Sequence, residues 1–238
     1  GKKRGLGYAT EGNRTGGAGD TRRARLPLVT TRRAGAGRRN IASNREKWEE
    51  TERSSAKVHA HPVNPEMIFT ELSPRLPDNC ILSGDAGTAT NWLARHLVMR
   101  RGMKFALSGS LATMGPAVPY AIAAKFAFPD RVAIAMTGDG AMQMNGLAEL
   151  ITVKKYWKRW SDPRIIFLVL NNRDLNQVSW EMRVESGDPK FPASQDLPDF
   201  PYARYAEMLG FTGIHVDDPK QLGPAWDKAF ASDRPAVY

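Results

Sequence analysis

The sequence predicts an α/β fold with a doubly wound, mainly parallel sheet and helices on both of its faces. Two apolar runs rich in β-branched residues, Val132–Thr137 and Ile165–Leu170, are each about one strand long. A run that is apolar on both faces is typical of a strand buried in a parallel sheet. Between the runs, Leu147, Leu150, Ile151 and Trp157 fall at helical spacing, which predicts a crossover helix. The stretch therefore predicts a strand–helix–strand unit.

The segments on either side of this unit also predict alternating helices and strands. Asn64 followed by Pro65 is a typical helix start, with the asparagine as N-cap and the proline at the first helical position. The segment 184–202 holds four prolines and predicts a long irregular loop, of the kind that often covers a site. We expect further helices at 64–76, 89–97, 116–127, 202–210 and 218–231, and further strands at 81–83, 213–216 and 235–238.

The positive charge of the chain is confined to its first quarter. Residues 1–57 hold 15 Lys or Arg and 6 Asp or Glu, whereas residues 58–238 hold 19 of each. Residues 1–40 are rich in Gly, Arg and Thr and have too few large apolar side chains for a core, which predicts disorder. Residues 41–57 are charged and predict a short exposed helix or linker. We therefore divide the chain into a basic segment, 1–57, and a folded domain, 58–238.

Three interpretations of the basic segment remain open. It could be an arm that binds nucleic acid or anionic lipid, a solvated leader, or upstream sequence that is not native to the domain. The folded domain carries no net charge and gives no electrostatic reason to expect nucleic-acid binding by itself. A nucleic-acid-binding protein is therefore an alternative only through residues 1–57.

Composition narrows the location and the class of the protein. Cys80 is the single cysteine, so an internal disulfide is excluded, and a buried thiol in a reducing, cytoplasmic compartment is expected. The sequence contains no run of 18 apolar residues, so we expect no membrane-spanning helix. We also see no apolar stretch of the kind that forms a secretory signal. His59 and His61 are expected to be exposed loop residues rather than a metal pair.

Polar residues follow the two strands of the central unit. Gly138-Asp139-Gly140 ends the first strand and opens the helix, where free N–H groups favour a phosphate. Because Asp139 would repel a bare anion, a divalent cation is expected between the carboxylate and the phosphate. Asn171 and Asn172 end the next strand at the same edge and offer neutral oxygens. Carboxylate, amide and phosphate oxygens together suit Mg²⁺ or Ca²⁺.

The order of these motifs resembles the thiamine diphosphate motif, in which GDG is followed by a helix and by an apolar strand that ends in NN. The segments Ser108-Gly-Ser-Leu-Ala-Thr-Met-Gly-Pro116 and LNNRDLNQVSWEMR resemble the pyruvate oxidase and acetolactate synthase family in particular. The resemblance covers roughly residues 64–238. It corresponds only to the C-terminal, diphosphate-binding domain of that family.

The resemblance implies a set of site residues. The metal, Mg²⁺, would be bound by Asp139, Asn172 and the backbone carbonyl of Asp174, although thirty residues separate GDG from NN, several more than is usual. We assign the extra residues between GDG and NN to an enlarged loop at 158–164. The diphosphate would lie against Gly138, Gly140 and Ala141.

The remaining contacts implied by the resemblance come from two upstream segments. Thr88 would contact the diphosphate, with N-capping of the helix 89–97 as its structural alternative, whereas Ala89 is less polar than the family pattern. Small residues including Ser108 would let the backbone approach a flat ring. Met114 would be the apolar wedge under the cofactor rings, and the carbonyl of Ala112 would accept a hydrogen bond from the 4′-amino group. Gln177 and Trp180 would lie near the substrate mouth.

The implied activity is decarboxylation of a 2-oxo acid, usually pyruvate, with the cofactor as the electron sink. The electron or acyl acceptor is left open between oxygen, a quinone reached through FAD, a proton and a second 2-oxo acid. The enzyme could therefore be an oxidoreductase, peripheral to the membrane if it is linked to quinone, or a transferase. Any flavin, FAD, would lie mostly in a further domain.

The family pattern also implies a missing part. The glutamate that activates the cofactor comes from a pyrimidine-binding domain of a partner subunit, and nothing upstream of residue 64 resembles that domain. We therefore expect no catalytic residue in this chain, which would be a fragment that is inactive alone, from a homo-oligomeric full-length enzyme. The alternative is a non-catalytic or split subunit that needs a separate pyrimidine-domain chain.

Overall fold

The computed structural model describes the backbone of residues 31–238 and the side chains of residues 37–238. Residues Trp48–Tyr238 form one compact unit. We predicted disorder for residues 1–40, and residues 1–30 of this segment lie outside the described residues. Residues 31–40 form the first part of helix α1 (Thr31–Ser55), which begins ten residues before the helix expected at 41–57. Six of residues 31–40 are arginine or alanine, which favour a helix, whereas Gly35 and Gly37 oppose it.

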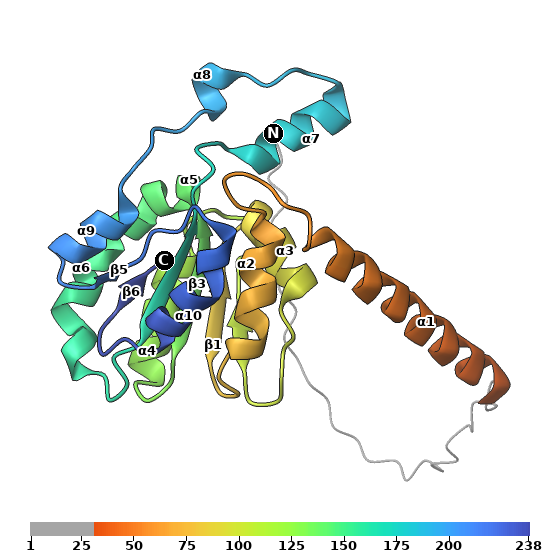
Figure 1. The fold of residues 1–238 in the computed structure, drawn as a ribbon, viewed down its shortest axis with the longest axis horizontal. Helices are drawn as coiled ribbons and strands as arrows, with labels where there is room; N and C mark the ends of the chain where they lie inside the picture. Colours follow the sequence, from red (N-terminus) through yellow and green to blue (C-terminus); the bar gives the residue numbers. More distant parts are fainter. Residues whose placement is uncertain (1–30) are drawn as a thin grey trace, which may run out of the picture. The chain divides into compact units, whose positions relative to one another are not determined.

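The core of the compact unit is a six-stranded sheet in the order β2-β1-β3-β4-β6-β5, and every neighbouring pair is parallel. Figure 1 shows helices on both faces of this sheet. The predicted doubly wound α/β fold is therefore confirmed. The strands are β1 (Ile81–Gly84), β2 (Lys104–Ala106), β3 (Ala133–Gly138), β4 (Ile165–Leu170), β5 (Thr212–Gly213) and β6 (Ala236–Val237).

The helices divide between the two faces. Helices α2 (Pro65–Leu72), α3 (Thr88–His96) and α10 (Leu222–Phe230) contribute to one apolar core, and α4 (Ala117–Ala127), α6 (Leu147–Tyr156) and α9 (Tyr202–Met208) contribute to the other. The remaining described elements are α5 (Asp139–Ala141), α7 (Asn176–Ser186), α8 (Pro192–Gln195), the π-helix Met142–Gly146 and the 3₁₀ turns Ser73–Arg75, Trp157–Arg159 and Pro219–Gln221.

The alternation of side chains along β3 sets the spacing of the layers. Ile134 and Met136 enter the core under α2, α3 and α10, whereas Ala133 and Ala135 enter the core under α4. All four side chains are fully buried. The small side chains on the second face let α4 approach the sheet closely through its own small residues, among them Ala121.

The course of the chain creates a crevice at one edge of the sheet. Neighbouring strands β1 and β3 are followed by helices on opposite faces, since Leu93 of α3 lies in one core and Met142, just after α5, lies in the other. Such a topological switch point is where open parallel sheets bind ligands, outside the carboxyl ends of the strands. Figure 1 shows α5, α7 and α8 at this edge.

Several elements differ from the prediction. Helix α7 fills a stretch for which we predicted no helix, because its turns expose Val178, Trp180 and Val184 and show no buried stripe. The short edge strand β2 is exposed and was also missed. The proline-rich segment is mainly loop, as predicted, but contains the short helix α8. Strand β5 is shorter than the predicted 213–216.

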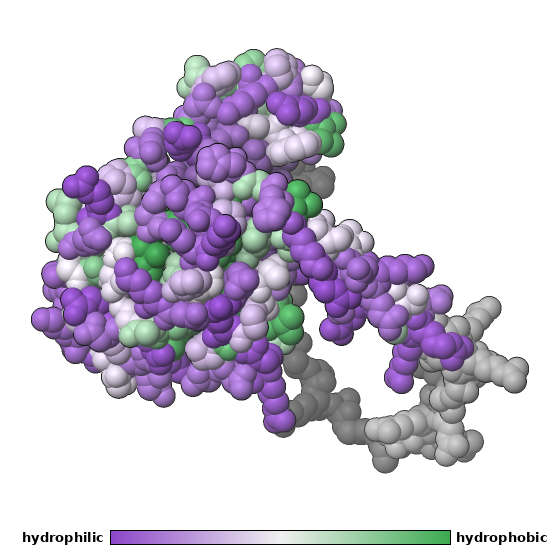
Figure 2. Space-filling model, in the orientation of Figure 1, coloured by the Kyte–Doolittle hydropathy of each residue, from purple (hydrophilic) through white to green (hydrophobic). Residues whose placement is uncertain are grey.

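The single cysteine and two histidines have the exposure that the sequence predicts. Cys80 is fully buried and His59 and His61 are exposed, as predicted. Figure 2 shows a mostly hydrophilic face on which apolar side chains form small, separate patches. No described helix has both the length and the apolar composition that a bilayer crossing demands.

Candidate functional site

A cleft lies at the switch point, outside the carboxyl ends of β1, β3 and β4. It is lined by backbone and side chains from the start of α3, from the end of β3 and from the turn that follows β4. Of the predicted site residues, this cleft brings together Thr88, Met114, Gly138, Asp139, Gly140, Asn172 and Asp174. It does not include Ser108, Ala112 or Ala141 in its lining.

Asp139 is a buried carboxylate at the start of α5. Its side chain accepts hydrogen bonds from the N–H of Gly140, at 2.9 Å from Oδ1, and from the N–H of Arg173 at Oδ2. Only 2% of the residue is exposed, and this burial raises the pKa of the Asp139 carboxyl despite the two backbone donors. A buried carboxylate with no charged partner of its own is destabilised unless a cation binds it.

The turn after β4 closes against this carboxylate. Arg173 has a φ of +56°, a left-handed conformation that is unusual for a residue with a Cβ. This conformation directs the N–H of Arg173 at Asp139, so the contact is made by backbone. The ends of β3 and β4 therefore meet at one point, and Asn172 and Asp174, on either side of Arg173, both reach the cleft.

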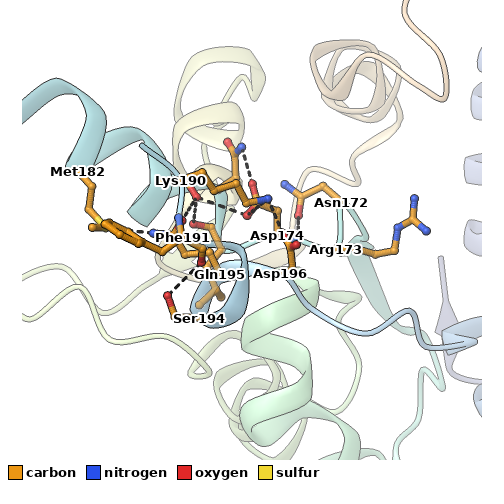
Figure 3. A network of polar contacts seen from close by, with 12 residues as sticks. Asn172, Arg173, Asp174, Met182, Lys190, Phe191, Ser194, Gln195 and Asp196 are labelled. Atoms are coloured by element: carbon orange, nitrogen blue, oxygen red, sulfur yellow. Dashed lines mark hydrogen bonds and ion pairs between the residues drawn. The ribbon is translucent and has the colours of Figure 1, made fainter. Parts of the chain in front are cut away.

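A network of polar contacts holds the turn from its outer side (Figure 3). Lys190 pairs with the carboxylates of Asp174, at 3.0 Å, and of Asp196, at 2.5 Å. Hydrogen bonds to these two carboxylates, Asp196 first, raise the pKa of Lys190. The side chain of Gln195 accepts hydrogen bonds from the hydroxyl of Ser179, at 3.1 Å, and from a backbone N–H in the same loop.

The contacts of Asp174 show which of its oxygen atoms has no hydrogen-bond or ion-pair partner. The carboxylate is occupied by Lys190 and by the amide of Asn176. The antiparallel bridge between Asp174 and Asp196 uses the carbonyls of Arg173 and Gln195 for its two hydrogen bonds, and not the carbonyl of Asp174. The backbone carbonyl of Asp174 is therefore the oxygen left to act as a ligand.

Glycines shape the floor of the cleft. A Cβ at Gly87, where φ is +106°, or at Gly138 would meet no atom within 4 Å, so both positions face open space. A Cβ at Gly140, in contrast, would lie 2.7 Å from Leu175 and 3.4 Å from the terminal methyl of Met114. Gly140 is thus the point where apolar side chains close over the start of α5.

The segment before α4 presents Met114 to the cleft and turns sharply on both sides of it. Ala112 has a φ of +45° and Gly115 a φ of +98°. Ala112 and Arg173 are the described non-glycine residues with positive φ; Ala112 is itself a predicted acceptor, and Arg173 lies between the two predicted ligands Asn172 and Asp174. Such conformations persist where surrounding structure fixes them, and they are concentrated at binding sites. Ser108 accepts a hydrogen bond from the N–H of Thr113, at 3.4 Å.

Thr88 and Ala89 begin α3 at the rim of the cleft. Gly87, and not Thr88, occupies the N-cap position, so the capping alternative for Thr88 is wrong. Glycine fits there because the position has a positive φ. Ala141 is buried in the first turn after β3, and Gln177 lines the cleft, whereas Trp180 is 54% exposed on α7.

Sequence reasoning missed Asp85, which ties three segments of the site together. Its buried carboxylate accepts from the N–H of Gly115, at 2.6 Å, and from the hydroxyl of Thr137, at 2.8 Å. Burial raises the pKa of Asp85. Asp85 therefore fixes the turn that carries Met114 relative to β1 and β3. Its place just after a predicted strand, between two glycines, was the available signal.

Tyr202 and Gln143 were also missed. The hydroxyl of Tyr202 donates to the carbonyl of Asp139, at 3.3 Å, and accepts from the amide of Gln143, at 3.1 Å. Burial raises the pKa of Tyr202 to about 12, so the hydroxyl keeps its proton. Tyr202 lies 63 positions from Asp139, and no spacing or motif in the sequence indicates that the two residues meet.

The role of Asp85 is tested by two replacements of similar size. In Asp85→Asn, the new amide can still accept from Gly115 and can donate to Thr137, whose hydroxyl can turn to the carbonyl of Gly138, 3.1 Å away. We expect Asp85→Asn to change the free energy of unfolding by less than about 1 kcal/mol, and Asp85→Leu to lower it by about 2–4 kcal/mol, because both donors lose their acceptor. Urea unfolding measures both values; equal losses would contradict the assignment.

Comparison with known proteins agrees with this geometry. The family model described as "Thiamine pyrophosphate enzyme, C-terminal TPP binding domain" matches residues 85–238. The thiamine pyrophosphate-containing protein YdaP of Bacillus subtilis is 35% identical over 190 residues, which are 80% of this chain and 31% of that protein.

Two acetolactate synthase large subunits of Escherichia coli are also similar. Isozyme 3 is 29% identical over 178 residues, 74% of this chain and 30% of the relative, and isozyme 2 is 30% identical over 170 residues, 71% of this chain and 30% of the relative. The chain thus spans about three tenths of the length of these relatives. It belongs to the thiamine pyrophosphate enzyme family and carries the C-terminal domain that binds this cofactor, which is also called thiamine diphosphate.

Proposed function

We propose that the cleft binds thiamine diphosphate through Mg²⁺ and forms the cofactor-binding side of an enzyme that decarboxylates a 2-oxo acid, with pyruvate as the first substrate to test. The observation that carries this proposal is the buried carboxylate of Asp139, which has backbone donors but no cationic partner in the described structure. Its position at the end of a parallel strand is where a ligand of this fold is expected.

The donor set fits a hard divalent cation. The carboxylate of Asp139, the amide oxygen of Asn172 and the backbone carbonyl of Asp174 are all oxygen ligands, which Mg²⁺ prefers. The amide oxygen of Asn172 accepts the N–H of Asp174, at 3.1 Å, which keeps the turn closed. A cation would offset the desolvation that raises the pKa of Asp139.

The diphosphate fits the space beside Gly138 and Gly87, where a Cβ would meet nothing. Two helical segments begin here, at Thr88 and at Asp139, and backbone N–H groups of their first turns suit phosphate oxygens; the N–H of Gly140 is bonded to Oδ1 of Asp139 and would have to be shared. We assign Thr88, Gly138, Gly140 and Ala141 to this part of the cofactor.

The rings of the cofactor are assigned to the segment around Met114. Met114 offers a flexible apolar surface beside Gly140, the carbonyl of Ala112 is an available acceptor, and Ser108 supports this segment through Thr113. When bound, the cofactor supplies an electron sink for cleavage of a bond next to a carbonyl. The residues of this chain hold the cofactor and keep water from its inner side.

We propose that the residues of this cleft do not activate the cofactor. Asp139 and Asp174 are the carboxylates in the lining, and both are already engaged. Apolar side chains are exposed on two segments that also contribute to the cleft lining, Leu111 at 85% just before Met114 and Val184 at 75% on α7. We propose that a pyrimidine-binding domain, from the same protein or from a partner chain, covers them and supplies the activating glutamate, as in a homo-oligomer or a split enzyme.

This proposal predicts that the purified 238-residue chain does not decarboxylate pyruvate by itself. The physical reason is that binding and activation come from different domains. Turnover is measured by release of CO₂ with thiamine diphosphate and Mg²⁺ present. Turnover by the chain alone would overturn the prediction, whereas addition in trans of a pyrimidine-binding domain from a related enzyme is expected to create it.

Binding is tested by calorimetric titration of thiamine diphosphate into the chain, with Mg²⁺ and with EDTA. We expect binding that depends on Mg²⁺. If the folded chain does not bind the cofactor, the titration is repeated with the pyrimidine-binding domain added. Binding would then show that the pocket needs its partner domain, and continued lack of binding would show that the assignment is wrong. Once turnover exists, formation of acetolactate identifies a transferase, and reduction of a quinone with FAD identifies an oxidoreductase.

A further inference from the structure

A second cluster of ligand-type side chains lies away from the cleft, where three helices meet. Glu52 comes from the last part of α1, Glu66 from the first turn of α2, and His96 from the end of α3. One side-chain atom of each lies within 4.8 Å of the other two. Their side chains are 8%, 13% and 4% exposed.

Three atoms at the centre of this cluster have no hydrogen-bond partner. They are Oε2 of Glu52, Oε2 of Glu66 and Nε2 of His96, and all three are buried. Nε2 lies 3.0 Å from Oε2 of Glu52 and 3.4 Å from Oε2 of Glu66. These contacts are ion pairs only with a protonated imidazole, and neither is a hydrogen bond. Buried polar atoms without partners are rare, because each one costs free energy.

The neighbours of the cluster orient it without filling it. Arg95 binds the other oxygen of Glu52, Oε1, through Nε at 3.0 Å and Nη2 at 2.6 Å. The guanidinium of Arg95 in turn lies over the rings of Trp48 and Trp92, at 5.0 and 5.7 Å from their centroids. Glu52 is therefore held with its free oxygen toward His96, in the way that hydrogen bonds from surrounding residues orient the ligands of a metal.

We propose that Glu52, Glu66 and His96 form a structural site for a divalent transition metal of the Zn²⁺ class. Imidazole and carboxylate are ligands that Zn²⁺ accepts. In a tetrahedral zinc site, with bonds of about 2.0–2.1 Å, neighbouring ligand atoms lie about 3.3 Å apart. The observed separations of 3.0 and 3.4 Å match this spacing.

The charges of the cluster agree with a bound cation. Two carboxylates face each other, and Arg95 neutralises only one of them from its far side. Burial lowers the pKa of His96, which favours the neutral imidazole, and this is the form that binds metals. A metal here would fasten α1 to α2 and α3. The cluster shares no residue with the cleft, so this inference does not depend on the proposed cofactor site.

The test is titration of ZnCl₂ into the metal-stripped 238-residue chain by calorimetry, without cofactor. We expect one site of micromolar or tighter affinity, and an intense visible spectrum of tetrahedral type when Co²⁺ replaces Zn²⁺. His96→Gln and Glu66→Gln should each weaken binding by at least about 100-fold, since each removes one of three protein ligands. Circular dichroism checks that the variants are folded, and if His96→Gln is not, Glu66→Gln and the Co²⁺ spectrum decide.

Two matched controls exclude other sites. The double variant His59→Gln/His61→Gln removes two exposed imidazoles, and Asp217→Ala removes an exposed carboxylate; both should bind Zn²⁺ like the unmodified chain. Binding that is lost in the His59/His61 variant and kept in His96→Gln would overturn the proposal. So would weak, millimolar binding, or a Co²⁺ spectrum of octahedral type.

Discussion

Replacing Asp139 with alanine is expected to weaken Mg²⁺-dependent binding of thiamine diphosphate by at least about 100-fold, or about 2.7 kcal/mol. The carboxylate is the charged member of the proposed ligand set, and the other two members are neutral oxygens. Alanine also leaves the N–H groups of Gly140 and Arg173 without their acceptor, so the free energy of unfolding is expected to fall as well. The affinity is therefore measured on protein shown to be folded. Calorimetry measures the affinity, and urea unfolding measures the stability.

The matched control is Asp217→Ala, which removes an exposed carboxylate elsewhere. It should leave both quantities unchanged. Asp139→Asn separates charge from shape, because the amide keeps one oxygen at the same place, and an intermediate loss is expected. If Asp139→Ala bound the cofactor with full affinity and still required Mg²⁺, the metal would have to be bound elsewhere.

Replacing Lys125 with methionine is expected to lower the free energy of unfolding by about 2–4 kcal/mol. Lys125 is fully buried in α4. Its ammonium donates to the carbonyls of Pro129, Arg131 and Asp162, at 3.1, 2.5 and 2.8 Å. Burial lowers the pKa of Lys125 to about 8, so the group is still charged at neutral pH and can serve all three acceptors. Methionine fills the space but leaves the carbonyls of Arg131 and Asp162 without a donor, whereas the carbonyl of Pro129 keeps the N–H of Asp162.

The control for Lys125 is Lys228→Met, which changes an exposed lysine on α10 and should stay within about 0.5 kcal/mol. The loops that Lys125 joins precede β3 and β4, at the sheet edge opposite the cleft. Cofactor affinity, measured on folded protein, should therefore be unchanged. A stability loss below about 1 kcal/mol would show that water satisfies these carbonyls.

The sequence predicted those parts of the site whose chemistry is local. The strand that ends in Gly138, the turn at Asp139 and the strand that ends at Leu170 each carry their signal within a few residues. Because parallel strands place their carboxyl ends at one edge, the meeting of Asp139 with the turn at 172–174 followed from the fold class.

The parts that were missed depend on contacts between distant segments. Asp85 matters because it meets Gly115 and Thr137, 30 and 52 residues away. The π-helix Met142–Gly146 was not expected, and it includes Gly146, where a Cβ would lie 3.2 Å from Val118 of α4. Helix α7 was missed because its apolar side chains face outward, so that it shows no buried stripe.

The cleft draws its lining from segments between residues 86 and 178, and no single segment contains more than part of it. It can exist only after β1, β3 and β4 have paired, and pairing of parallel strands across crossover helices is a slow step in folding. A ligand of this cleft can therefore bind the native chain and not the unfolded one. By mass action, free ligand at 100 times its Kd would add about 2.7 kcal/mol to the apparent stability, so the cofactor supply would help set how much folded protein a cell retains.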